Sequence, residues 1–126
     1  MSLGKSPFPA VASRELAQQL SGRKKAEYKL PLWHQTPGIY YPPALNMEQA
    51  SSEATARYKA SLVAGQLLVD LTGGLGVDDF FFSRTILVVH YCELDTQLAE
   101  IASHNFKRLG VENIVVHVGD GMAQLP

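Results

Sequence analysis

Leu67-Leu68-Val69-Asp70-Leu71-Thr72-Gly73-Gly74-Leu75-Gly76 is the stretch that decides the fold of this 126-residue chain. Its apolar first half predicts a buried strand that ends at Asp70, and its second half is a glycine-rich turn. The next residues, 77–82, predict a short helix. A strand, a glycine turn and a helix in this order let backbone N–H groups approach a nucleotide-like ligand closely.

Two more strands are predicted after this turn. Ile86–Glu93 is a continuous run rich in β-branched residues, as expected for a parallel strand buried on both faces. A helix with one apolar stripe follows it, capped by Asp95 or Thr96, and Ile114–Val118 is the third strand. Strands that alternate with helices predict an α/β fold, half of a doubly wound parallel sheet.

Each predicted strand ends in an acid, namely Asp70, Glu93 and Asp120. Ligands of such sheets lie across the carboxyl ends of the strands, so the three carboxyls are expected at one site. A nicotinamide dinucleotide site would need a third glycine where Asp79 stands, and no phosphate-binding Gly-Lys-Ser/Thr loop is present. The acids instead favour a cationic or zwitterionic nucleoside, whose ammonium, hydroxyl and amine groups donate to carboxylates.

The stretch 70–76 resembles the first motif of the class I S-adenosylmethionine-dependent methyltransferases, an acid followed by Gly-x-Gly-x-Gly, with Thr72 in place of the first glycine. The resemblance continues through Glu93, residues 105–111 and 119–121. It implies a Rossmann-like sheet, S-adenosyl-L-methionine as cofactor and transfer of its methyl group. With threonine at the first glycine position, the motif most resembles that of enzymes that methylate guanine in RNA. Examples are the bacterial small-subunit rRNA methyltransferases and the cap-trimethylating enzymes.

The same resemblance implies a role for each site residue. Glu93 would hold the ribose hydroxyls, Asp120 would meet the adenine amine, and Asp70 would lie beside the methionine part. Gly74 and Gly76 would leave room for the cofactor. The expected cofactor-binding residues are Asp70, Thr72, Gly73, Gly74, Gly76, Glu93, Leu94, Asp120 and Gly121.

The charge of the chain is unevenly distributed. Residues 1–60 hold eight Lys/Arg and four Asp/Glu, whereas residues 61–126 hold three and eight. Residues 1–65 are therefore expected to form a helical, basic arm, and residues 66–126 the first half of the cofactor-binding domain. A polyanion such as RNA suits a basic arm, and a solvated basic face is the plain alternative. The expected RNA contacts are Arg23, Lys24, Lys25, Lys29 and the nearby aromatic residues.

Those aromatic residues, Trp33, Tyr40 and Tyr41, lie in the proline-rich segment 30–43, which is predicted to be extended and irregular. Exposed rings there would stack on bases. The favoured alternative is that the rings hold the arm against the body of the protein.

Two helices are predicted in the arm. One begins with Ser13 as its N-cap and is stopped by Gly22, and the other spans about 47–64 with Asn46 as its cap. The polar start of the second helix, residues 48–53, could face a ligand or solvent, and the sequence alone favours solvent. Residues 49–53 and the following Tyr58-Lys59-Ala60 are similar to the leader of bacterial RNA-methylase-like proteins.

The chemistry of methyl transfer is not encoded in these residues. The motif that positions the nucleophile in the resembling family follows a fourth strand, and nothing here matches it. The chain is therefore expected to be a fragment, with the catalytic residue after Pro126 and with an open edge on its first strand. The alternative function is a non-catalytic Rossmann-like module that binds RNA or a partner.

Composition excludes several other classes. No apolar run approaches the ~18–20 residues of a membrane span. The basic N-terminal residues are not followed by an apolar stretch, so they do not have the pattern of a signal peptide. A single cysteine, Cys92, excludes an internal disulfide and favours a reducing, cytoplasmic location. Cys92 and four scattered histidines show no metal-site spacing, so no metal is expected. The oligomeric state stays open.

Overall fold

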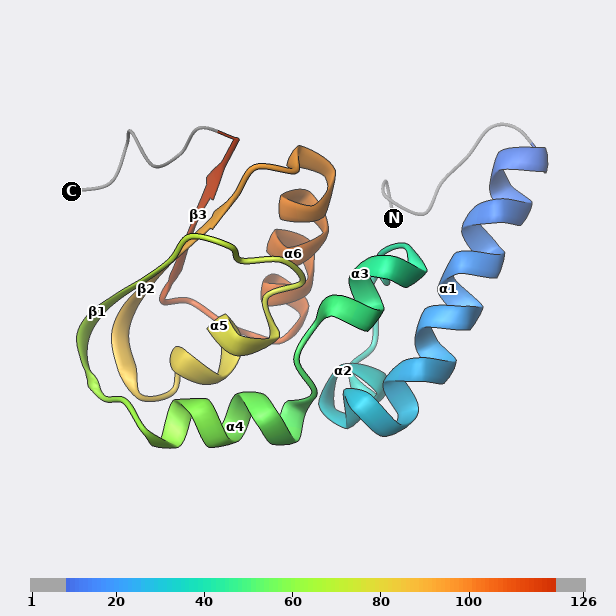
Figure 1. The fold of residues 1–126 in the computed structure, drawn as a ribbon. Helices are drawn as coiled ribbons and strands as arrows, with labels where there is room; N and C mark the ends of the chain where they lie inside the picture. Colours follow the sequence, from blue (N-terminus) through green and yellow to red (C-terminus); the bar gives the residue numbers. More distant parts are fainter. Residues whose placement is uncertain (1–8, 120–126) are drawn as a thin grey trace.

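The structure, a computed structural model, describes residues 9–119 (Figure 1). A small parallel sheet lies at one end of the molecule and the long first helix at the other, with short helices between them. The helices and strands in chain order are α1 (Pro9–Lys29), α2 (Pro31–Gln35), α3 (Ala44–Gln49), α4 (Glu53–Ser61), β1 (Gly65–Asp70), α5 (Val77–Phe82), β2 (Ile86–Glu93), α6 (Thr96–Arg108) and β3 (Ile114–Val118).

The three strands form a parallel sheet in the order β1-β2-β3. Asp70 pairs with Tyr91, and Glu93 pairs with Val118, so the carboxyl ends of all three strands meet at one edge. The predicted α/β fold, an incomplete Rossmann-like sheet preceded by a helical arm, is confirmed. As parallel connections require, α5 lies between β1 and β2 in the chain, and α6 lies between β2 and β3.

The outer edge of β1 has no strand partner among residues 9–119, as the sequence predicted. β1 is less buried than expected, because Leu67 and Val69 are 57% and 39% exposed. In the central strand β2, by contrast, Val89 and Tyr91 are fully buried. The apolar sequence of β1 therefore indicates a strand, but its burial depends on what neighbours it.

The single helix predicted over about 47–64 is wrong. The structure has α3 and α4 instead, separated by a break at residues 50–52, where Ala50 and Ser52 are extended. The Ser52 side chain accepts a hydrogen bond from the Thr55 N–H at 3.1 Å and so caps α4. Asn46, predicted as the cap, lies inside α3.

The first helix is longer than predicted, since α1 continues through Gly22 to Lys29. Gly22 does not stop the helix. Instead, its missing side chain lets Tyr41 approach, because a Cβ on Gly22 would lie 2.4 Å from the Tyr41 Cβ. The segment predicted to be irregular also contains α2, which Pro31 starts at a position where its missing N–H costs nothing.

Aromatic packing holds the arm against the sheet domain. Trp33 is fully buried and meets the Phe80 ring edge-on at 5.1 Å between centroids. Tyr40 and Tyr41 are buried as well, so none of the three rings is available to stack on bases. For Trp33, the favoured interpretation that the rings hold the arm against the body is therefore confirmed, whereas the Tyr41 ring packs against Gly22 within the arm.

Buried hydrogen bonds reinforce this contact. The Asn105 side chain of α6 accepts from the Tyr40 N–H at 2.8 Å and donates to the Tyr40 carbonyl at 2.9 Å. Within the arm, the buried Glu53 carboxylate also accepts from the Leu32 N–H at 2.6 Å. Arm and body thus share one hydrophobic core, and the division at residue 65 stays a prediction.

None of the helices within residues 9–119 has both the length and the apolar character to cross a bilayer.

Candidate functional site

A cleft of about 340 Å³ opens beside the glycine turn at the carboxyl ends of the strands. The turn and the start of α5 form one wall. The end of α3 and its link to α4 form a second wall, and the end of β2 with the start of α6 completes the cleft. The lining residues that carry its polar character are Asn46, Gln49, Ser51, Thr72, Asp78, Glu93 and Asp95.

The glycines of the turn face different neighbours. A Cβ on Gly73 would overlap the Tyr91 ring, and a Cβ on Gly76 would lie 2.4 Å from the Phe106 ring of α6. Gly76 also has a φ of +88°, which disfavours any other residue. A Cβ on Gly74 would meet no atom closer than 3.8 Å. Gly73 and Gly76 therefore allow close packing under the turn, whereas Gly74 leaves open space.

Glu93 lies in the cleft at the end of β2. One carboxylate oxygen accepts from the Gly74 N–H and the other from the Asp95 N–H, each at 2.9 Å. A carboxylate oxygen can accept more than one hydrogen bond, so both oxygens retain capacity for a ligand. The Asp95 side chain itself caps α6 by accepting from the Leu98 N–H at 3.1 Å.

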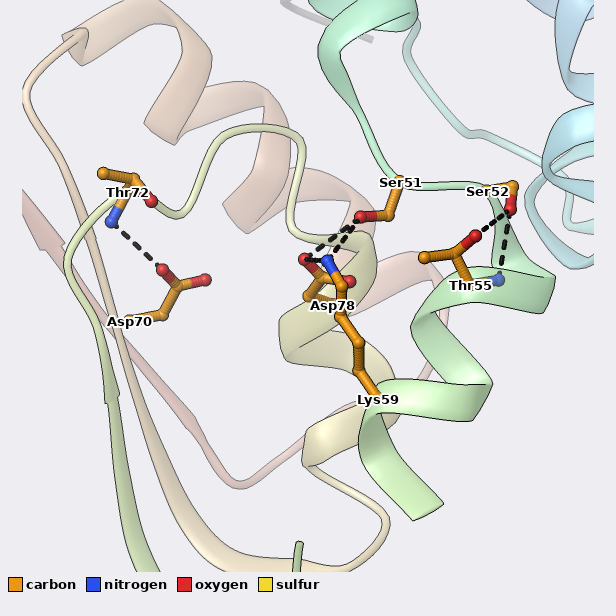
Figure 2. Close-up of polar contacts among 7 residues, drawn as sticks. All are labelled: Ser51, Ser52, Thr55, Lys59, Asp70, Thr72 and Asp78. Atoms are coloured by element: carbon orange, nitrogen blue, oxygen red, sulfur yellow. Dashed lines mark hydrogen bonds and ion pairs between the residues drawn. The ribbon is translucent and has the colours of Figure 1, made fainter. Parts of the chain in front are cut away.

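The structure brings together five of the nine sequence-predicted site residues, since Thr72, Gly73, Gly74, Gly76 and Glu93 all line the cleft. Asp70 and Leu94 are not among its lining residues. Asp70 instead accepts a hydrogen bond from the Thr72 N–H at 3.0 Å, as Figure 2 shows. Leu94 is 75% exposed. Asp120 and Gly121 lie outside the described residues.

Sequence reasoning missed the wall formed by the α3–α4 link. For residues 48–53 the sequence favours solvent over a ligand, but Gln49, Ala50 and Ser51 line the cleft and Glu53 is buried. The two adjacent serines before Glu53 are a signal that could have found this break, because serine favours helix N-caps over helix interiors.

Ser51, Lys59 and Asp78 form a polar cluster that ties this link to α5 (Figure 2). Lys59 Nζ lies 3.1 Å from Asp78 Oδ2 and 3.1 Å from Ser51 Oγ. The Ser51 hydroxyl also donates to Asp78 Oδ2 at 3.2 Å. Because Ser51 and Asp78 both line the cleft, this Ser51–Lys59–Asp78 cluster fixes two of its walls relative to each other.

Acidic groups dominate the electrostatics behind the turn. Asp79 is fully buried, and burial, followed by the neighbouring Asp70, raises its pKa well above the usual range. Burial and then the nearby Glu93 carboxylate raise the pKa of Tyr91, whose hydroxyl donates to the Gly74 carbonyl. The site therefore favours a ligand that carries positive charge or hydrogen-bond donors.

Two of the four basic residues expected to bind RNA are engaged within the protein. Lys25 pairs with Glu48 at 3.3 Å, and Lys29 donates to the Met47 carbonyl at 2.7 Å. Arg23 and Lys24 are exposed and form no ion pair within the described part of the chain.

Comparisons with known proteins bear on the fold. No family model and no curated protein matches the chain. A solved structure from Porphyromonas gingivalis W83, described as a candidate methyltransferase, is 31% identical with a TM-score of 0.82. Wild-type Trm5b from Pyrococcus abyssi is 22% identical with a TM-score of 0.50, over 66% of this chain and 23% of that one.

The first similarity covers 98% of this chain but only 32% of the Porphyromonas gingivalis protein. The chain thus spans about a third of that protein. Its three parallel strands, the helices between them and the preceding helical arm all lie within the matched region. The chain therefore has the Rossmann-like fold of a methyltransferase.

Proposed function

We propose that this chain is the cofactor-binding part of an S-adenosyl-L-methionine-dependent methyltransferase. The observation that carries the proposal is the cleft in which the glycine turn and Glu93 meet at the carboxyl ends of parallel strands. The 31% identity to a candidate methyltransferase over nearly the whole chain supports it.

The residues present fit such a cofactor. Gly74 leaves open space beside the turn, and Glu93 keeps acceptor capacity for the ribose hydroxyls. The acidic surroundings suit a ligand with an ammonium and a sulfonium charge. When bound, the cofactor supplies an electrophilic methyl group, and the residues of this chain bind and orient it. Asp120 and Gly121 complete the proposed binding set.

Calorimetry with S-adenosylhomocysteine tests this proposal on the intact protein. The wild type should bind, and Glu93→Ala should weaken binding by about tenfold or more through lost charge-assisted hydrogen bonds. Glu112→Ala is the matched control, because Glu112 is an exposed acid that does not line the cleft. Absence of wild-type binding would contradict the proposal. Binding without methyl transfer would favour the non-catalytic module.

We further propose that the substrate is RNA and that α1 contacts it. Arg23 and Lys24 are the exposed cations of the basic stretch, and Tyr28, four residues after Lys24, is 86% exposed on the same helix. Residues four apart share a helix face, so Lys24 and Tyr28 can contact a phosphate and a base together.

RNA binding at several salt concentrations tests the substrate proposal. Replacing Arg23 and Lys24 by Gln should lower the affinity and reduce the slope of log K against log salt by about two. Lys107→Gln, an exposed cation on α6, is the control and should change little. Unchanged affinity in the Arg23/Lys24 variant would point to a protein or small-molecule substrate.

A further inference from the structure

Helix α3 contributes two amide side chains to the cleft beside the glycine turn. Asn46 and Gln49 both line the cleft. They are three residues apart, so they lie on one face of the helix, about 4.5 Å apart along its axis. Asn46 is half-buried and Gln49 is exposed, and neither side-chain amide forms a hydrogen bond within residues 9–119. Both amides are therefore free to bind a ligand in the cleft.

Most other polar side chains of the cleft cannot offer a free donor. Glu93 and Asp95 are carboxylates, which only accept hydrogen bonds when they are ionised. Ser51 and Asp78 are bonded to each other, and both contact Lys59. Among the described residues that line the cleft, none is a lysine or an arginine. A negatively charged group of a ligand bound there therefore needs neutral donors.

The two amides lie toward different ends of the cleft. Asn46 also lines a small adjoining cavity of about 30 Å³ together with Asp95, which follows the end of β2. Gln49 instead precedes the link to α4, whose Ser51 bonds to Asp78 at the start of α5. Helix α3 thus runs along the cleft from the end of β2 toward the glycine turn and α5.

The ligand of the proposed function has a different chemical group at each of these ends. Its ribose hydroxyls belong at Glu93, and its amino-acid part, which carries the one carboxylate, belongs beside the glycine turn. The amide of Gln49 and the hydroxyl of Thr72 are the unengaged side-chain donors among the described residues that line this end. An amide N–H that donates to a carboxylate forms a charge-assisted hydrogen bond, which is stronger than a neutral one.

We propose that α3 is a specificity element of the cofactor site: Gln49 donates to the carboxylate of the amino-acid part, and Asn46 hydrogen-bonds the ribose beside Glu93. The inference rests on the proposed function and adds two residues to its binding set. A carboxamide both donates and accepts, so Asn46 complements Glu93, which only accepts from a hydroxyl. Gln49 supplies the neutral donor that a cleft without lining cations requires.

Calorimetry on the intact protein with two ligands tests these roles. S-adenosylhomocysteine has the amino-acid part, whereas methylthioadenosine keeps the adenosine but lacks the carboxylate and the ammonium. Gln49→Ala should weaken S-adenosylhomocysteine binding about tenfold and leave methylthioadenosine binding unchanged. Asn46→Ala should weaken the binding of both ligands by similar factors, because both contain the ribose.

A charged variant separates a direct contact of Gln49 from a change in the shape of the cleft. Glutamate is nearly the same size as glutamine, but it cannot donate and it repels a carboxylate. Gln49→Glu should therefore lose at least as much S-adenosylhomocysteine affinity as Gln49→Ala and bind methylthioadenosine as the wild type does. Leu45→Ala is the control and should change neither affinity, because Leu45 is an exposed residue of α3 that does not line the cleft.

The outcomes distinguish this inference from the proposed function. Equal losses for the two ligands in Gln49→Ala, or wild-type affinity for S-adenosylhomocysteine in Gln49→Glu, would overturn the role of Gln49. Unchanged affinities in Asn46→Ala would overturn the role of Asn46. Failure of the wild type to bind S-adenosylhomocysteine would instead contradict the proposed function itself.

Discussion

Asp79 is fully buried, and this burial raises its pKa well above that of an exposed aspartate. An aspartate on a helix surface would be ionised at neutral pH, but within residues 9–119 no donor is placed to bond with the buried Asp79 carboxyl. The same group therefore makes the stability of the protein depend on pH.

We predict that Asp79→Asn becomes more stable than the wild type as the pH rises. Because the pKa of Asp79 is raised on folding, its contribution to stability is complete below the ordinary aspartate pKa of about 4 and is lost as the pH rises toward the folded-state value. Urea unfolding of both proteins between about pH 4 and about pH 8 measures the difference in their free energies of unfolding. A constant difference between the two proteins would show that Asp79 ionises normally.

Gly76 illustrates a residue required for two reasons at once, its positive φ and the contact with Phe106. We expect Gly76→Ala to lower the free energy of unfolding by about 3 kcal/mol through backbone strain and overpacking. Gly110→Ala is a matched control, because Gly110 has a φ of +76° but open space around its Cβ position. It should cost only about 1 kcal/mol. Urea unfolding measures both losses of free energy. Equal losses in the two variants would show that crowding against Phe106 contributes nothing to the cost at Gly76.

At the level of elements, the break between α3 and α4 converts a solvent-facing stretch into a wall of the cleft. A continuous helix over residues 47–64 would not bring Ser51 to Asp78 in the same way, because the link at residues 50–52 is extended. The Ser51–Lys59–Asp78 cluster then joins α4 to α5 across this link.

We predict that Lys59→Met weakens S-adenosylhomocysteine binding more than it destabilises the protein. Lys59 is 45% exposed, so loss of its ion pair should lower stability by less than about 1 kcal/mol. Binding should fall several-fold, because Asp78 and Ser51 lose their common partner. Lys25→Met, which breaks the exposed pair with Glu48 on the arm, should leave binding unchanged. Calorimetry and urea unfolding of both variants separate the two effects.

At the scale of the whole molecule, the arm and the sheet domain are joined by Trp33, which packs against α5. We expect Trp33→Ala to destabilise the protein by about 3–5 kcal/mol, as for other buried aromatic residues replaced by alanine. Tyr28→Ala, on the exposed face of α1, should change stability by less than about 0.5 kcal/mol.

Native-state hydrogen exchange tests the cooperativity that this packing implies. Amides of α1 and of β2 should open in the same unfolding event, because one hydrophobic core spans both regions. Separate opening of α1 at much lower free energy would support the predicted division at residue 65 instead.

The sequence determined the framework of this molecule. Runs of apolar, β-branched residues predict strands at Ile86–Glu93 and Ile114–Val118, which are the observed bounds of β2 and β3. Asp95, one of the two expected caps, is the N-cap of α6. The sequence likewise predicts a ligand site at the glycine turn and Glu93, and Glu93 lines one cleft with Gly73, Gly74 and Gly76. These features are local, because strand period, turn glycines and helix caps depend on residues close together in the chain.

Tertiary structure alone decided the remainder. Gly22 is a contact point for Tyr41, Trp33 is part of the core, Ser51 lines the cleft and Asp79 is fully buried. These roles arise from neighbours that lie far away along the chain; Trp33, for example, packs against Phe81, 48 residues later in the sequence. Burial and pKa depend on the atoms that surround a side chain in space, and sequence patterns do not specify those atoms.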